Sequence, residues 1–133
     1  MERIAIYLRL SKEDEGDRDE SNSISNQRQL ILDYIRRDKK LRKLECIELK
    51  DDGYSGKNLN RPGVQKLLEL VRKQQISVVI VKDMSRLSRD YLVLGQYTEQ
   101  IFPFLGVRFI AINDSYDSSL CEGGVGEIDV AFK

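Results

Sequence analysis

The sequence predicts an α/β domain, with an open, mostly parallel sheet of about four to five strands flanked by helices in a flavodoxin-like, three-layer arrangement. Short apolar, β-branched runs alternate along the chain with longer segments whose apolar residues recur at helical spacing. One run, SVVIV at 77–81, is apolar at every position, as expected for a strand buried on both faces. The length suits one domain, so we expect residues 1–133 to form a single unit.

The first half of the chain contains two predicted strands and two predicted helices. RIAIYL at 3–8 is short and β-branched, and LECIELK at 44–50 alternates like a strand. Between them, 23–38 carries an apolar stripe at helical spacing. A second helix over 61–73 opens with Pro62, a residue that favours the first helical turn.

The second half repeats this alternation. The buried strand at 77–81 is followed by a helix that begins at Asp90, a good N-cap, and ends near Pro103 and Gly106. The run VRFIAI at 107–112 is the next predicted strand. Strands and helices thus alternate along the whole chain, which favours parallel pairing.

Polar and charged residues collect where the predicted strands end. Open parallel sheets bind ligands beyond the carboxyl ends of their strands, so these residues decide the function. They are Arg9 and Ser11, Asp51 and Asp52, Lys82 to Arg89, and Asn113 and Asp114.

The arginines at this edge predict a phosphate ligand. Arg86 and Arg89 follow the third predicted strand, which this topology places beside the strand that carries Arg9. Guanidinium forks match phosphate oxygens, and the helix start after Arg89 offers backbone N–H groups to an anion. Ser11, two residues after Arg9, is then the candidate nucleophile.

Other residues at this edge leave alternatives open. Arg9 taken alone could instead pair with Asp51 or Asp52 on the next strand. Gln27 interrupts the apolar stripe of the first helix, so it should point under the sheet edge and bond either to the site or to backbone. The glycine-rich segment after the aspartates carries Arg61 and is predicted to be a loop over the strand ends or a surface turn.

Composition excludes several kinds of site. The chain has no histidine, so a Ser-His-Asp triad and a histidine-ligated metal are impossible. The two cysteines, Cys46 and Cys121, lack metal-site spacing, and we expect neither a metal nor a cofactor. No apolar run approaches the roughly 18 residues that span a bilayer, so we expect no membrane partner and a cytoplasmic location.

Charge is balanced in total but patterned along the chain. The net charge of +0 argues against a free-standing nucleic-acid binder. Residues 13–20 hold six acids and residues 36–43 hold six bases, and we interpret both blocks as solvated surface.

Five motifs in order resemble the serine recombinase family of resolvases, invertases, and large serine integrases and transposases. The resemblance covers nearly the whole chain, as an N-terminal catalytic domain, and implies a resolvase-like fold. The long acidic stretch between the first two motifs resembles the large subgroup. The motifs are YLRLS (7–11), SISNQ (23–27), DDGYSGKNLNRPG (51–63), SRLSRD (85–90) and GVRFIAIND (106–114).

The resemblance implies a role for each residue at the sheet edge. Ser11 would be the nucleophile, and Arg9, Arg86 and Arg89 would bind the phosphate. The residues that would support the site or contact DNA phosphate are Tyr7, Gln27, Asp51, Asp52, Arg61 and Ser85.

The family's reaction and partners follow from the same resemblance. It implies a 5′-phosphoserine bond to double-stranded DNA without a metal or nucleotide, and exchange of strands in homodimers that pair as synaptic homotetramers. It also implies that the chain stops before a long dimerisation helix and a DNA-binding region, so that residues 1–133 alone should bind DNA poorly.

One departure from the family pattern and two other readings stay open. Ser85 stands where small resolvases carry an aspartate, so Asp83 or Asp90 could substitute, or no acid is needed. A non-catalytic phosphate- or nucleotide-binding module on the same sheet would use the arginines and leave Ser11 inert. A receiver-type signalling domain would need clustered acids after the first strand, where this chain has Arg9 and Ser11.

Overall fold

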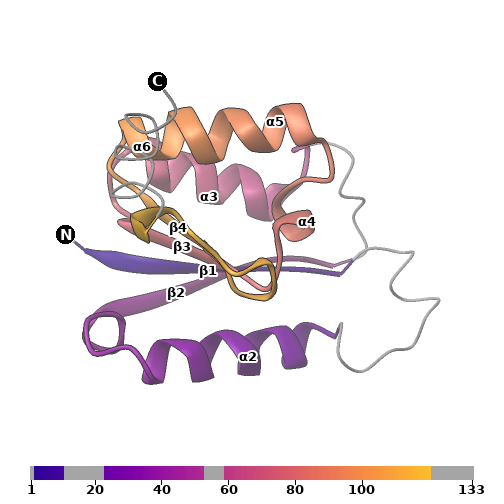
Figure 1. Cartoon of the computed structure of the whole chain (residues 1–133). Helices are drawn as coiled ribbons and strands as arrows, with labels where there is room; N and C mark the ends of the chain where they lie inside the picture. The colour runs from indigo at the N-terminus through magenta and orange to yellow at the C-terminus, as the bar shows by residue number, and fades with distance from the viewer. Residues whose placement is uncertain (1, 11–22, 53–58, 121–133) are drawn as a thin grey trace.

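Five strands form one sheet in the order β2-β1-β3-β4-β5 (Figure 1). The computed structural model describes residues 2–10, 23–52 and 59–120. Within them the strands are β1 (Arg3–Leu10), β2 (Glu45–Asp52), β3 (Val78–Val81), β4 (Arg108–Ala111) and β5 (Tyr116–Asp117). The first four pair in parallel, and the two-residue β5 pairs antiparallel with β4. The predicted open, mostly parallel sheet is confirmed.

The central position of β1 is what assembles the site edge. This strand pairs with β2 on one side and β3 on the other, as predicted for the third strand. In the pairing with β2, Arg9 lies opposite Asp51 and Leu10 opposite Asp52. The carboxyl ends of β1, β2 and β3 therefore meet at one edge of the sheet.

Helices cover both faces of the sheet, which gives the expected three layers (Figure 1). On one face lies α2 (Ile24–Arg36), which is capped by Ser23 through a bond to the N–H of Asn26. The other face carries α3 (Pro62–Arg72), α4 (Met84–Leu87), α5 (Tyr91–Gln96), a π-helical turn (Tyr97–Ile101) and α6 (Phe102–Phe104). Two 3₁₀ turns lie at Leu41–Lys43 and Ile112–Asp114.

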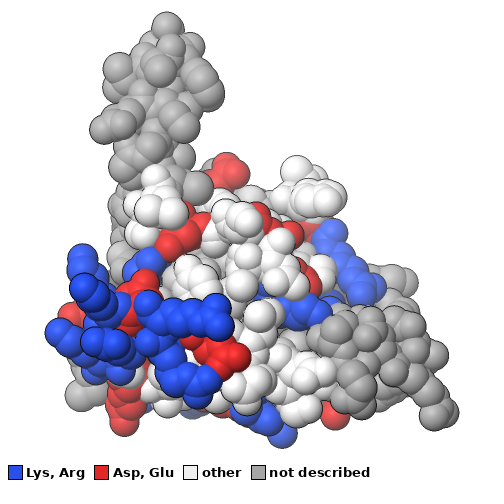
Figure 2. Space-filling view, turned by 60° about the horizontal axis from the view of Figure 1, so that its bottom comes forward, with Lys and Arg blue, Asp and Glu red and all other residues white. Residues whose placement is uncertain are grey.

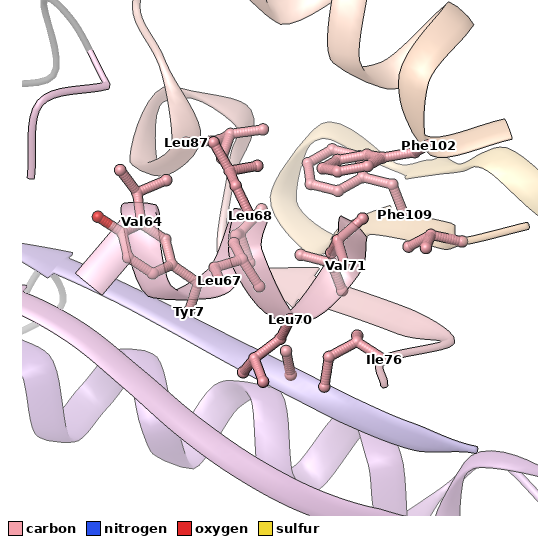
Figure 3. Close-up of a cluster of buried hydrophobic side chains, with 14 of the residues drawn as sticks. Tyr7, Val64, Leu67, Leu68, Leu70, Val71, Ile76, Leu87, Phe102 and Phe109 are labelled. Atoms are coloured by element: carbon pink, nitrogen blue, oxygen red, sulfur yellow. The ribbon is translucent and has the colours of Figure 1, made fainter. Parts of the chain in front are cut away.

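Each face of the sheet has its own apolar core. Ile31 and Ile35 of α2 pack with the β1 residues that point to that face. On the opposite face Leu67 and Val71 of α3 pack with Phe102 and other buried side chains (Figure 3). Full burial of one such side chain contributes about 1.5–3 kcal/mol, so these two cores hold the strands in register beneath the site.

Two elements differ from the sequence-based expectation. The short helix α4 was not predicted, and it occupies the segment between β3 and α5. The helix expected from Asp90 is interrupted by the π-helical turn before Pro103, a residue that cannot donate a backbone hydrogen bond. Within the described residues, no helix combines the length and the apolar character that crossing a membrane requires.

Candidate active site

The carboxyl edge of the sheet brings the predicted arginines together. Arg9, Arg61 and Arg86 are 0%, 2% and 5% exposed, whereas Arg89 is exposed. We call these four residues the arginine frame. The predicted nucleophile Ser11 and the acidic block 13–20 lie outside the described residues, as does the stretch 53–58 of the glycine-rich segment.

Arg9 is anchored to the backbone of α4. Its Nε donates to the carbonyl of Arg86 at 3.1 Å, and its Nη2 donates to the carbonyl of Ser85 at 2.8 Å. Burial, followed by the like charges of the other three arginines of the frame, lowers the pKa of Arg9 to about 10. The guanidinium remains charged at neutral pH, so binding of an anion nearby would offset the cost of burying it among like charges.

Gln27 holds the backbone of Arg9 from the opposite face of the sheet. Its Nε2 donates to the carbonyl of Arg9 at 2.9 Å, and its Oε1 accepts from the N–H of Arg9 at 3.2 Å. Arg86 also donates to that carbonyl, through Nη1 at 3.0 Å. The prediction that Gln27 points under the sheet edge is confirmed, and the bonds named here are to backbone.

Arg61 supports α4 from beneath. Its Nη1 donates to the carbonyl of Arg86 at 3.0 Å and its Nη2 donates to the carbonyl of Leu87. The same Nη1 donates to the hydroxyl of Tyr7 at 3.1 Å. Because Arg61 is buried and its guanidinium bonds to the end of a short helix, it acts here as a support for the segment that carries Arg86 and Arg89.

Asp51 joins β1, β2 and the start of α3. Its carboxylate accepts from the Tyr7 hydroxyl at 2.6 Å and from the N–H groups of Gly63 and Val64 at 2.7 and 3.0 Å. Burial raises the pKa of Tyr7, which keeps its hydroxyl protonated as a donor. A side chain at Gly63 would place Cβ 2.6 Å from the carbonyl oxygen of Lys50, so the close approach requires glycine.

The remaining predicted residues, Asp52 and Ser85, are less buried than Arg9, Arg61 and Arg86. Asp52 is exposed at the end of β2, and Ser85 is half-buried. Arg89 and Ser85 line a cavity of about 580 Å³ that Asp83 and Asp114 also border. This concavity beside the arginine frame is large enough for part of a ligand.

The start of α5 corrects one expectation. We expected the free N–H groups of this helix start to face an external anion. Two of them donate instead to the Asp90 carboxylate, from Leu92 at 2.9 Å and from Val93 at 3.4 Å. An N-cap aspartate neutralises these donors itself. The arginines, not this helix start, are the cationic part of the site.

Sequence reasoning did not assign a partner to Asp83. Its Oδ1 accepts from the hydroxyl of Ser85 and lies 3.6 Å from Nε of Arg86. The available signal was its place at the end of a buried strand, two residues before Ser85.

A second group of cations lies at the other end of the sheet. The basic cluster, which we define as the Lys and Arg side chains of residues 36–43, is exposed throughout. It begins at the last residue of α2 and precedes Glu45, which pairs with Arg3 at the start of β1. Figure 2 shows Lys and Arg side chains gathered at the end of the α2 face where Figure 1 places this connection.

Comparison with known proteins gives matches over nearly the whole chain. A family model described as "Resolvase, N terminal domain" matches residues 4–125. A protein of Bacillus subtilis (strain 168), described as "Putative DNA recombinase", is 36% identical over 89 residues, which are 67% of this chain and 16% of that protein. The matched part is therefore a small fraction of that relative's length.

Solved structures agree with the fold. The N-terminal catalytic domain of TP901-1 integrase superimposes with a TM-score of 0.73 at 23% identity, covering 98% of both chains. A resolvase family site-specific recombinase from Streptococcus pneumoniae has a TM-score of 0.65 at 25% identity, covering 98% of this chain and 89% of that one. The C-terminal catalytic domain of ISC1926 TnpA, an IS607-like serine recombinase, has a TM-score of 0.63 at 28% identity, covering 83% and 69%.

Proposed function

This chain belongs to the resolvase family, whose N-terminal domain it matches, and we propose that it is a serine recombinase catalytic domain that cleaves and rejoins DNA through Ser11. The observation that carries the proposal is that Arg9, near the carboxyl end of β1, and Arg86 of α4 hold one another in place by hydrogen bonds. Arg9 lies two residues before Ser11 in the chain. A buried, bonded cationic frame suits a phosphodiester.

The proposed reaction exchanges one phosphate ester for another. Oγ of Ser11 attacks the phosphorus, an Oγ–P bond forms, and the bond from phosphorus to the 3′-oxygen breaks. Ser11 loses its proton, and the leaving oxygen gains one to become a 3′-hydroxyl. A 3′-hydroxyl of the recombining strand then reverses the step, so the energy of the ester bond is retained for rejoining.

The arginine frame would act on the charge of the transition state. Negative charge builds on the nonbridging oxygens as Ser11 attacks, and donors that are already fixed stabilise it without reorganisation. Arg9 and Arg86 are held by bonds to one another's backbone carbonyls. Arg89 is exposed and lines the cavity, and in this proposal it contacts the DNA first.

The proposed partners are double-stranded DNA and further copies of the chain. The net charge of +0 gives this domain little general attraction for DNA. Grip on a specific site would then come from other parts of the recombinase, and a synaptic homotetramer of paired dimers would bring four copies of Ser11 to the crossover.

The test is recovery of covalent protein–DNA adducts, an experiment that itself identifies the target site. Cells expressing the tagged, complete recombinase polypeptide are lysed in denaturant, and the DNA that stays attached to the protein is sequenced. We expect defined 5′ ends linked to a peptide that contains Ser11, and no adducts from Ser11→Ala. Ser88→Ala, a matched change in a serine that lies between Arg86 and Arg89, should leave adducts detectable.

Two outcomes would overturn the proposal. Normal adducts from Ser11→Ala would remove the nucleophile assignment. A wild-type protein that binds its DNA without any adduct would favour the non-catalytic phosphate-binding module.

A further inference from the structure

We propose that Asp83 is a positioning residue of the phosphate site, a carboxylate that holds the hydroxyl of Ser85 and the guanidinium of Arg86. The proposal rests on the recombinase function proposed above and adds a residue that the five motifs do not assign. It also answers which acid serves the position where Ser85 stands.

The contacts of Asp83 converge on one carboxylate oxygen. Oδ1 accepts the hydrogen bond from Oγ of Ser85 and lies 3.6 Å from Nε of Arg86. The Arg86 side chain is 6% exposed and that of Asp83 is 21% exposed, so solvent screens this ion pair far less than a surface pair. The carboxylate thus restrains the guanidinium that also donates to the carbonyl of Arg9.

Asp83 is available for this role because another residue caps its helix. Asp83 occupies the N-cap position of α4, where an aspartate ordinarily accepts from the first N–H groups, yet its side chain makes no capping bond. The N–H of Met84 donates instead to Oδ2 of Asp114 at 2.6 Å. Asp114 comes from the turn after β4, so the fold supplies the cap and leaves Asp83 to Ser85 and Arg86.

The other candidate acid is already committed. The carboxylate of Asp90 caps α5 by accepting from Leu92 and Val93. Asp90 is exposed, whereas Asp83 is half-buried. Asp83, and not Asp90, accepts from Ser85 and pairs with Arg86.

The contact with Asp83 also sets the direction of the Ser85 hydroxyl. Because Oγ donates its hydrogen to Asp83, its lone pairs remain available as acceptors, and both residues line the cavity. Arg9 also holds Ser85, because its Nη2 donates to the backbone carbonyl of Ser85. In this proposal Ser85, oriented by Asp83, offers an acceptor to the cavity that Arg89 also lines, in place of the carboxylate of a directly acting aspartate.

The test compares three variants of the complete recombinase polypeptide. The probe is a duplex carrying the crossover sequence mapped from the covalent adducts, and the measurement is the single-turnover rate of adduct formation. D83N keeps the side chain's size and removes its charge, and we expect an about 10- to 100-fold lower rate, because a misplaced group at a reacting centre costs on this order. D90N is the matched control, since asparagine caps a helix as well as aspartate, and its rate should equal the wild-type rate.

The informative variant moves the carboxylate. In D83S/S85D the two side chains exchange places, which returns an acid to position 85 beside Arg86. We expect a rate well above that of D83N, with duplex binding by gel shift and melting temperature near wild type in all three variants. A residue that served only to hold α4 together would not be rescued in this way.

The outcomes separate this inference from the function on which it rests. D83N at the wild-type rate, or a folded and DNA-bound D83S/S85D no faster than D83N, would overturn the role of Asp83 while wild-type adducts still support the recombinase. Absence of wild-type adducts would overturn the proposed function and this inference with it.

Discussion

Two groups of cations in the described part of the chain differ in burial and in the bonds that they make. The arginine frame lies at the carboxyl edge of the sheet, largely buried and bonded to backbone carbonyls. The basic cluster is exposed at the amino edge of the sheet, at the end of α2 and along the connection to β2. The cluster contains more charges, yet the frame is the group that we propose to bind phosphate.

We infer from this comparison that fixed geometry, more than the number of charges, suits a group of cations to phosphate chemistry. Charges in the basic cluster lie on exposed side chains, where they are screened over about 8 Å at physiological ionic strength. In the frame, burial and like neighbours already act on Arg9, lowering its pKa to about 10, so an incoming anion relieves an existing cost. Such preorganised donors are what a transition state can use.

The largest effect on the rate of adduct formation should come from replacing the guanidinium of Arg9 with another cation. Arg9→Lys keeps a cation but cannot reproduce the two bonds to the carbonyls of Arg86 and Ser85. We expect adduct formation to slow by about 100- to 1,000-fold, the usual effect of removing one transition-state donor. Arg3→Lys, at the other end of the same strand, is the matched control. Equal rates for both variants would show that charge alone suffices.

The next effect should come from the support beneath the frame. Tyr7→Phe removes the hydroxyl that links Asp51 to Arg61, so each of these two buried charged groups loses one hydrogen bond. We expect a loss of roughly 1–3 kcal/mol in the free energy of unfolding, measured by denaturant titration. Tyr97→Phe is the control, because no hydrogen bond of its hydroxyl is found among the described residues. A Tyr7→Phe protein as stable as this control would contradict the support role.

A pair of glycines tests the packing around Asp51. Gly63→Ala would bring Cβ to 2.8 Å from Oδ2 of Asp51, and we expect it to cost roughly 1–3 kcal/mol of stability. Gly95→Ala meets nothing within 4 Å in α5 and should stabilise by about 0.5–1 kcal/mol. Opposite shifts in melting temperature are therefore expected, and shifts of the same sign would contradict the close packing at Gly63.

The smallest effect should come from the basic cluster. In Lys39→Glu/Lys40→Glu two exposed charges are reversed far from the frame. Solvent-exposed ion pairs contribute only about 0–1 kcal/mol to stability, so the fold should persist. At saturating DNA we therefore expect an unchanged rate of adduct formation. A rate that falls as far as in Arg9→Lys would erase the distinction between the two regions.

Much of the fold follows from patterns that act locally. Apolar periodicity identified four strands and the main helices, because burial of one face or both faces leaves a repeat in the sequence. The same reasoning placed Arg9, Asp51 and Arg86 at one edge, and it placed Gln27 beneath that edge. The two-residue β5 and the four-residue α4 are too short to leave such a repeat, and tertiary contacts decide them.

The sequence by itself determined which residues reach the carboxyl edge, and it left Ser11 as a predicted nucleophile that the described residues do not test. Only the tertiary structure decided what each of them bonds to. Arg61 became a support for α4, Asp90 a helix cap, and Asp83 the partner of Ser85. The reason is physical, since a hydrogen bond depends on distance and direction between segments that chain order does not specify.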